Sequence, residues 1–190
     1  MKKIILSAIF TMAMVFTTNA QDHKWFIGGE FGFWSAKAGF NYYDNVYVPA
    51  DARTTTWGIA PEIGYNISDK FAVAASVGYL YQKTKTDWSE QKESGFVINP
   101  YFRYTFLKKG IVSAFIDAGA TFGISDFKGF EAGVKPGIAI ALTDRFSLVA
   151  HLGFVGYNDG KGVGNYATAG KSFGIDFSGY QSSFGVYYSF

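Results

Sequence analysis

Large apolar residues occupy every second position over most of the chain. At the C-terminus, Phe184, Val186, Tyr188 and Phe190 alternate with smaller or more polar residues. A period of two places successive side chains on opposite faces of a β-strand. The same alternation recurs seven times upstream, and it changes phase between Ile175 and Tyr180, which leaves the start of the last strand open. The pattern therefore predicts eight strands, at about residues 25–33, 56–65, 71–82, 95–106, 113–122, 130–142, 146–154 and 183–190.

The connections between these strands are of two kinds. Tight turns at 66–69, 107–110 and 143–145 contain the Asn, Asp and Gly residues typical of hairpins. The other four connections are mostly longer and more polar, and they span residues 37–53, 83–93, 125–129 and 158–177. Because short and long connections alternate strictly, all the long ones emerge at one rim. This layout predicts an all-β fold, an eight-stranded antiparallel up-and-down transmembrane β-barrel with both termini at the periplasmic end.

The two faces of the strands differ in composition. One face carries large apolar and aromatic residues, and the other is mostly Gly, Ala, Ser and Thr with a few charges, which suits a narrow lumen. We therefore expect the apolar face to point outward. A secreted lipocalin-like barrel is the alternative, but it would place its large apolar residues inside. The aromatic residues near strand ends predict two girdles: Trp25, Tyr65, Phe71, Phe106, Phe146 and Phe190 in one; Phe33, Trp57, Tyr81, Phe96, Phe122 and Phe130 in the other.

Three prolines interrupt the predicted strands, Pro61, Pro100 and Pro136. Proline has no N–H to donate to a sheet ladder. We therefore expect bulges or locally missing backbone hydrogen bonds at these positions.

The first twenty residues have the three-part layout of a secretory signal peptide. A basic start at residues 1–3 precedes the apolar run 4–16 and the small or polar residues 17–20. An N-terminal membrane anchor is the alternative, but the run is short for a bilayer core of about 30 Å. We therefore divide the chain into a signal peptide, 1–20, and an outer-membrane barrel domain, 21–190.

Composition and charge exclude several classes of protein. The chain has no cysteine, which excludes a disulfide framework, a thiolate zinc site and a lipid-modified cysteine. Aromatic residues make up 19%, which excludes a disordered chain. The formal charge of +2 is too small for nucleic-acid binding. Loss of residues 1–20 would remove two lysines and leave 15 basic residues against 15 acidic ones.

With these features together, the chain resembles the small OmpA- and OmpX-like barrels of Gram-negative outer membranes, a porin-like family. The signal sequence, the eight alternating segments and the terminal Tyr188-Ser189-Phe190 carry the resemblance. It implies a multi-pass monomer in the bacterial outer membrane, in contact with lipid and lipopolysaccharide, without a cofactor. Tyr188 and Phe190 are similar to the C-terminal signal that the family presents to the barrel assembly machinery. OmpA proper continues into a peptidoglycan-binding domain beyond the barrel, so cell-wall tethering is not carried over.

Charged residues recur on the inward face at similar depth. A charge in a narrow lumen needs a partner or water. Asp117 and Lys135 flank the short connection 125–129 almost symmetrically, so we expect them to face each other. Together with Arg103 they predict a polar network that blocks the lumen; a narrow or gated channel for small solutes or ions is the alternative. The predicted lumenal network is Glu30, Glu62, Arg103, Asp117, Glu131, Lys135 and His151.

The pattern argues against an enzyme, a metal site or a nucleotide site. A hydrolase triad needs a His near a nucleophilic Ser, and the chain has only His23 and His151. Leu152 and Gly153 follow His151, so the His-x-Ser pair of the lipid A deacylase barrel is absent. No metal-ligand spacing appears. The sequence therefore predicts no catalytic, cofactor or metal residues.

The long connections contain tyrosines beside glycine and asparagine, the composition of adaptable contact loops. The contact candidates are Tyr42, Tyr43, Tyr47 and Tyr166. We expect a protein of envelope structure or surface contact, with any surface ligand bound by these loops.

Overall fold

The computed structural model describes residues 24–38, 41–43, 46–48, 52–86, 89–160, 170–177 and 181–190. The predicted signal peptide and Tyr166 lie outside these residues. Within them the chain is almost entirely extended. The strands are β1 (Trp25–Ala38), β2 (Asn41–Tyr43), β3 (Val46–Val48), β4 (Ala52–Asn66), β5 (Phe71–Lys85), β6 (Glu90–Lys109), β7 (Val112–Ser125), β8 (Gly129–Ala141), β9 (Phe146–Leu152), β10 (Phe154–Gly160), β11 (Gly170–Asp176) and β12 (Ser182–Ser189).

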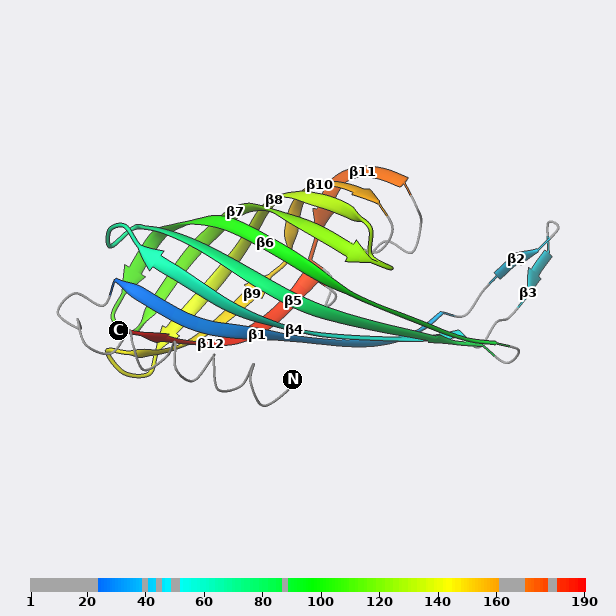
Figure 1. Cartoon of the computed structure of the whole chain (residues 1–190), viewed down its shortest axis with the longest axis horizontal. Coiled ribbons are helices and arrows are strands. Elements are labelled where there is room, and N and C mark those ends of the chain that lie inside the picture. Colours follow the sequence, from blue (N-terminus) through cyan, green and yellow to red (C-terminus); the bar gives the residue numbers. More distant parts are fainter. Residues whose placement is uncertain are drawn as a thin grey trace.

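The main sheet closes on itself. Neighbouring strands follow the order β8, β7, β6, β5, β4, β1, β12 and β9, and β9 pairs back onto β8. Every pairing is antiparallel. The strands β10 and β11 continue beyond β9 and β12 at the end with the long connections, which we call the outer end (Figure 1). The predicted eight-stranded antiparallel barrel is confirmed.

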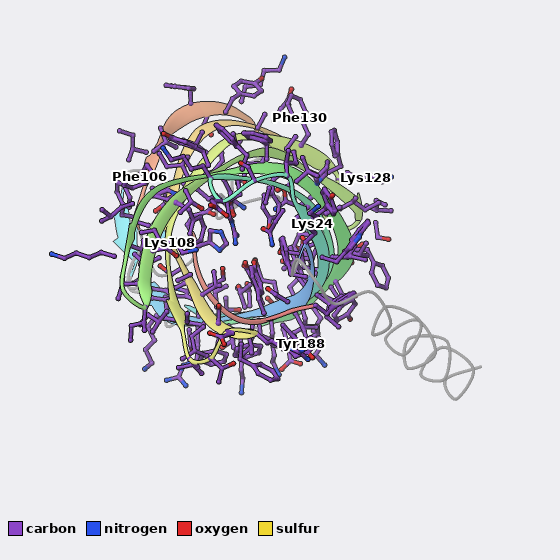
Figure 2. All side chains as sticks on the ribbon, turned by 90° about the vertical axis from the view of Figure 1, so that its left-hand side faces the viewer. Lys24, Phe106, Lys108, Lys128, Phe130 and Tyr188 are labelled. Atoms are coloured by element: carbon purple, nitrogen blue, oxygen red, sulfur yellow. The ribbon has the colours of Figure 1, made fainter. Side chains whose placement is uncertain are left out.

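The two faces of the barrel wall lie as the alternation predicts. Large apolar side chains such as Phe33, Val77 and Phe96 are exposed on the outside, each by more than half of its surface. Viewed along the barrel, Phe106, Phe130 and Tyr188 stand on the outside of the ring (Figure 2). Phe190 is only 7% exposed, and its ring stacks on that of the outward Tyr188 with 6.2 Å between centroids. Its backbone N–H donates to the carbonyl of Trp25 at 2.9 Å, which joins the last strand of the barrel to the first.

The structure corrects the facing of Phe154. The alternation predicts that it points outward, but it is 4% exposed and lies in the lumen. His151 pairs with Gly137 and Val155 with Val134, so three residues on β9–β10 oppose two on β8. This extra residue is a β-bulge, and it reverses the faces of the residues that follow.

The predicted loop at 83–93 is mostly strand. The strands β5 and β6 continue to Lys85 and from Glu90, so the hairpin extends well past the apolar alternation. Glu90 accepts ion pairs from Lys83 at 2.8 Å and from Lys92 at 2.9 Å. The hydrogen bond from Lys83 is the largest cause that lowers the pKa of Glu90 to about 2. Alternating polar residues build this part of the hairpin, and hydrophobic periodicity does not detect them.

The prolines lie where ladder pairing is interrupted. Pairing between β4 and β5 skips Pro61, pairing between β6 and β7 skips Pro100, and β8 lacks a partner at Pro136 on its β9–β10 side. The expected local loss of pairing at each proline is confirmed.

Candidate functional site

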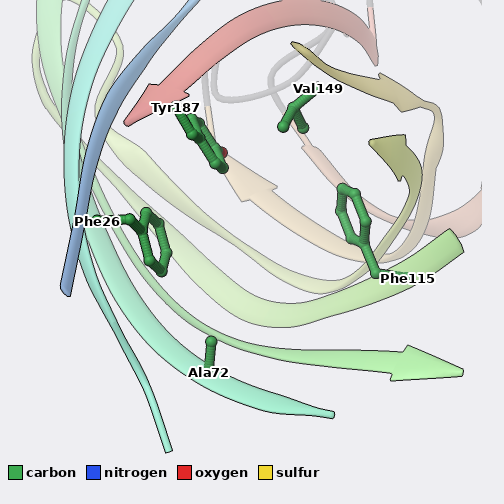
Figure 3. Close-up of a cluster of buried hydrophobic side chains, with 5 residues drawn as sticks. All are labelled: Phe26, Ala72, Phe115, Val149 and Tyr187. Carbon is green, nitrogen blue, oxygen red and sulfur yellow. The ribbon is translucent and has the colours of Figure 1, made fainter. Parts of the chain in front are cut away.

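A hydrophobic cluster fills the lumen near the end that carries the tight turns, which we call the turn end. It consists of Phe26, Ala72, Phe115, Val149 and Tyr187 (Figure 3). The rings lie over glycines of neighbouring strands: a Cβ atom at Gly64 would overlap the ring of Phe26, and one at Gly137 would overlap that of Phe115. Small residues on one strand thus make room for large ones on the next, and the cluster fills part of the lumen near the turn end.

An Arg–Asp ion pair lies directly against this cluster. Arg103 donates from Nε to Oδ1 of Asp117 and from Nη2 to Oδ2, both at 2.7 Å. The two residues are Cα partners across β6 and β7, and both are buried. The guanidinium also lies 3.9 Å from the centroid of the Phe115 ring, which is cation–π geometry. The bidentate pair joins two strands and attaches the charged layer to the hydrophobic cluster.

His151 connects two carboxylates across the lumen. Its Nε2 lies 2.7 Å from Oδ2 of Asp117, and its Nδ1 lies 2.9 Å from Oε1 of Glu30. Both ring nitrogens thus face acidic oxygens, an arrangement that favours the doubly protonated ring, the imidazolium. Glu30 also accepts from the Ser183 hydroxyl at 2.6 Å and from the Tyr187 hydroxyl at 3.0 Å. The network therefore reaches from β1 through β9 and β12 to β7.

Lys135 and Glu131 form a separate pair on β8. Asp117 and Lys135 are Cα partners, as predicted. The ammonium group, however, lies 3.1 Å from Glu131, four residues away on the same face of the same strand. The expectation that Lys135 joins Asp117 and Arg103 in one network is therefore wrong at the side-chain level. Asp117 already receives hydrogen bonds from Arg103 and His151.

Glu62 differs from the other lumenal acids. Its Oε1 accepts the Tyr101 hydroxyl at 2.5 Å. No Lys, Arg or His nitrogen of the described residues lies within 4.0 Å of its carboxylate. Every other acid of the predicted network has such a partner. Glu62 is therefore a buried carboxyl group whose hydrogen-bond partner Tyr101 is a neutral hydroxyl.

A cavity of about 240 Å³ lies on the outer side of this charged layer. Glu30, Glu62, Asp117, Glu131 and His151 line it together with apolar side chains nearer the outer end. None of the five residues of the hydrophobic cluster lines it. This cavity and the hydrophobic cluster therefore occupy different parts of the lumen, on opposite sides of the charged layer.

One arrangement in the network has the composition of a hydrolase triad. The Ser183 oxygen lies 3.5 Å from Nδ1 of His151, and Asp117 contacts the opposite nitrogen of the ring. The hydroxyl proton, however, is directed to Glu30 at 2.6 Å, and an imidazolium cannot accept it. The geometry does not activate Ser183. Within the described part of the chain, no group of three His, Asp or Glu side chains is placed to hold a metal ion.

Sequence reasoning missed the neutral members of the network, Tyr101, Tyr187 and Ser183. All three lie on the inward face of predicted strands, at the depth of the charges that they bond. Their position in the alternation was a usable signal. Their lack of charge is the reason that the pattern gave them no role.

The remaining predicted site residues of the described chain lie outside the lumenal network, on β2, on β3 and at the C-terminus. Tyr42 and Tyr43 lie on β2 and Tyr47 on β3, where Tyr42 and Tyr47 are Cα partners. At the C-terminus, the Tyr188 ring centroid lies 4.9 Å from that of Phe146, and its hydroxyl accepts from Arg145 at 3.2 Å.

No family model matches the chain. No curated protein matches it significantly. Among the described residues there is no helix of the length and hydrophobicity needed to cross a membrane.

Proposed function

We propose that this protein is an integral outer-membrane barrel whose lumen is closed, acting in envelope structure or in surface contact through its long connections. The observation that carries the proposal is the inverted distribution of side chains. Charged and polar groups are buried inside, and exposed aromatic and aliphatic side chains surround the outside. Soluble monomers rarely expose apolar patches of more than a few hundred Å². A hydrocarbon environment stabilises such a surface, and water does not.

The height of the apolar surface supports this setting. On β6 the exposed apolar residues run from Phe96 to Phe106. Ten residues at about 3.4 Å each, tilted by about 40°, span roughly 26 Å, close to the apolar band of about 25 Å of outer-membrane barrels. Charged residues follow at both ends, with Glu90, Lys92 and Glu93 before the run and Lys108 and Lys109 after it.

Closure of the lumen rests on two successive layers. The hydrophobic cluster fills the turn end, and the Arg103–Asp117–His151–Glu30 hydrogen bonds cross the lumen beside it. Eight strands enclose a lumen only wide enough for side chains to fill. A narrow channel, the alternative, would require both layers to move.

The experiment is cell fractionation followed by planar-bilayer recording. We expect the full chain to appear in the outer-membrane fraction and to shift on a gel when heated. We expect the refolded protein to show no conductance steps across voltage and pH. Reproducible steps that change in Asp117→Asn would overturn closure and support the channel. Recovery of the folded protein in the soluble fraction would overturn the membrane setting.

A further inference from the structure

Four strands of the barrel continue together at the outer end as an extended sheet. β1, β4, β5 and β6 stay paired side by side as far as Ala38, Ala52, Lys85 and Glu90 (Figure 1). Their pairing shows no shift of register over this length. Directly opposed residues of antiparallel strands share one face of the sheet. The register therefore fixes the face on which each side chain of the extension lies.

The basic residues of this extension lie on one face. Phe33 is 60% exposed and points outward, and Trp57 and Tyr81 follow it in the same row as successive cross-strand partners. The residues two and four positions further out on each strand point the same way. The charged residues that the structure describes on this outward face, which we call the basic face, are Lys37, Arg53, Lys83, Lys85, Glu90 and Lys92.

The opposite face of the same sheet is nearly uncharged. One row there consists of Trp34, Thr56, Gln82 and Glu93, and the next consists of Ala36, Thr54, Thr84 and Gln91. Glu93 is the one charged residue of these two rows. A sheet that only has to stay in water can carry charges on both of its faces. Basic residues confined to one face indicate that this face meets an environment that the other face does not.

Three bases of the basic face stand side by side in one row. Arg53 is the Cα partner of Lys37 on one side and of Lys85 on the other. Cross-strand partners have Cβ atoms about 5 Å apart, and like charges directly opposite each other destabilise a sheet. Among the described residues, no carboxylate lies within 4.0 Å of these three cations. A bound anion would remove the repulsion, and the described part of the chain does not supply one.

The second row of the basic face has a single counter-charge for two cations. Lys83 and Lys92 are Cα partners, and both contact Glu90, at 2.8 and 2.9 Å. On β10 and β11, by contrast, Lys171 is matched by Asp159 at 3.8 Å. With five bases against one acid, the basic face keeps a formal surplus of four positive charges.

The basic face begins directly beyond an aromatic cluster on the outside of the barrel. The Trp57 ring centroid lies 5.7 Å from that of Tyr81 and 5.8 Å from that of Tyr79, and the Tyr79 centroid lies 5.4 Å from that of Phe96. The two basic rows lie two and four residues further out than Trp57 and Tyr81. At about 3.4 Å per residue and a tilt of about 40°, these rows are roughly 5 and 10 Å beyond the cluster. Lipid head groups occupy this height, because they extend roughly 5–8 Å beyond the hydrocarbon core and long basic side chains reach toward them.

We propose that the basic face binds the phosphate groups of an outer-leaflet lipid, with Lys37, Arg53 and Lys85 as the principal contacts. The inference rests on the membrane setting proposed above, which brings this face to head-group height. Guanidinium and ammonium groups are the usual partners of phosphate oxygens. Three adjacent cations suit a head group that carries more than one phosphate. A lipid is the source because the basic face continues the apolar outer wall, so one molecule contacts the wall with its chains and the cations with its head.

The ligand class is tested by calorimetry on the folded full chain in neutral detergent. The probes are lipid A with two phosphates, the same lipid without phosphates, and inorganic phosphate. We expect the phosphorylated lipid to bind at least about tenfold more tightly than the phosphate-free lipid, because each cation at a charged lipid surface strengthens binding about fivefold. Equal binding of the two lipids would overturn the proposal. Inorganic phosphate that binds as tightly as the phosphorylated lipid would overturn the lipid as the source.

The place of binding is tested by removing the uncompensated row. We expect the triple variant Lys37→Gln, Arg53→Gln and Lys85→Gln to bind the phosphorylated lipid roughly 100-fold more weakly, at about fivefold for each cation. Binding of the phosphate-free lipid should not change. All three side chains are exposed, and the heat-dependent gel shift confirms that the variant is folded. Unchanged affinity for the phosphorylated lipid would refute the assignment of the site.

A matched control separates this site from the overall charge of the protein. Lys70→Gln, Lys108→Gln and Lys109→Gln remove three exposed lysines at the turn end, so the net charge changes by the same amount. Charges further away than about 10 Å are screened at ordinary ionic strength, so the control should bind as the native protein does. Equal weakening in the control and in the row variant would show that net charge attracts the lipid, and it would overturn the proposal.

Glu90→Gln should change the affinity in the opposite direction. It removes the acid that contacts Lys83 and Lys92, so we expect the phosphorylated lipid to bind about fivefold more tightly. Weaker or unchanged binding in the folded variant would refute recognition by charge. If the protein fractionates with the outer membrane but does not prefer the phosphorylated lipid, this inference fails and the proposed function stands. Recovery in the soluble fraction would overturn both.

Discussion

Asp117→Asn removes the one carboxylate that two cationic groups share. In the native protein, Arg103 donates two hydrogen bonds to it and His151 donates a third, all at 2.7 Å. An amide keeps the size of the side chain but leaves a buried guanidinium without a counter-ion. Removing one partner of a buried ion pair typically costs about 3–5 kcal/mol. We expect the free energy of unfolding to fall by about that amount.

A double-mutant cycle separates this ion pair from the packing around it. Arg103→Met alone leaves Asp117 with only His151, so we expect a loss of about 3 kcal/mol or more. In the double variant neither charge is left unpaired, so its loss should be close to that of one single variant. The resulting coupling energy between the two sites is about 3 kcal/mol, at the upper end for residues in contact.

The assay is guanidinium unfolding in lipid vesicles, followed by tryptophan fluorescence and by the heat-dependent gel shift. Lys83→Met is the matched control because it removes one partner of an exposed ion pair on the β5–β6 hairpin. Exposed pairs are worth about 0–1 kcal/mol, so this variant should scarcely change stability. If the Arg103 and Asp117 effects simply add, the buried pair is not the unit that holds the charged layer together.

Three further predictions test the cluster, the outer face and the hairpin. Phe115→Ala should lower the free energy of unfolding in vesicles by about 3–5 kcal/mol, because it empties the centre of the hydrophobic cluster; a loss below about 1 kcal/mol would mean that the cluster is not packed as described. Val77→Arg, on the outward face midway along β5, should cost about 2–4 kcal/mol in a bilayer, whereas an unchanged unfolding midpoint would place this face in water. The carboxyl group of Glu90 should titrate near pH 2 by NMR. Because its pKa is lowered by Lys83 and Lys92, its contribution to hairpin stability is complete above pH 4.5 and is lost as the pH falls through about 2; titration at 4.5 would show that these ion pairs do not persist in solution.

The sequence predicted the barrel well because its signal is distributed over the whole chain. A single inward or outward assignment can be wrong without changing the fold, as Phe154 shows. The bulge before it adds one residue to β9–β10. The hydrophobic pattern of the sequence contains no sign of this added residue. Phe190 shows a second limit. The alternation assigned its face, but its burial depends on contacts between the two ends of the chain.

The sequence predicted which charged residues face the lumen, but it did not predict which of them form ion pairs with one another. The backbone register makes both Arg103 and Lys135 direct neighbours of Asp117, one on each side. Arg103 pairs with Asp117 because its planar guanidinium bonds both carboxylate oxygens at once, whereas the ammonium group of a lysine is a point charge. Lys135 then pairs with Glu131 along its own strand. A choice between two equally placed cations depends on side-chain geometry, which spacing in the sequence does not contain.

The same register explains why large side chains fill the lumen near one end and a cavity lies toward the other. Near the turn end, Gly64 and Gly137 lie beneath Phe26 and Phe115, so neighbouring strands supply large and small side chains that fill the lumen. Toward the outer end, pairing between β1 and β12 ends at Phe31 and Phe184, whereas β1 continues to pair with β4 as far as Ala38. The hydrophobic cluster and the charged layer beside it therefore occupy the part of the lumen nearer the turn end, and the cavity lies on the outer side of the charged layer.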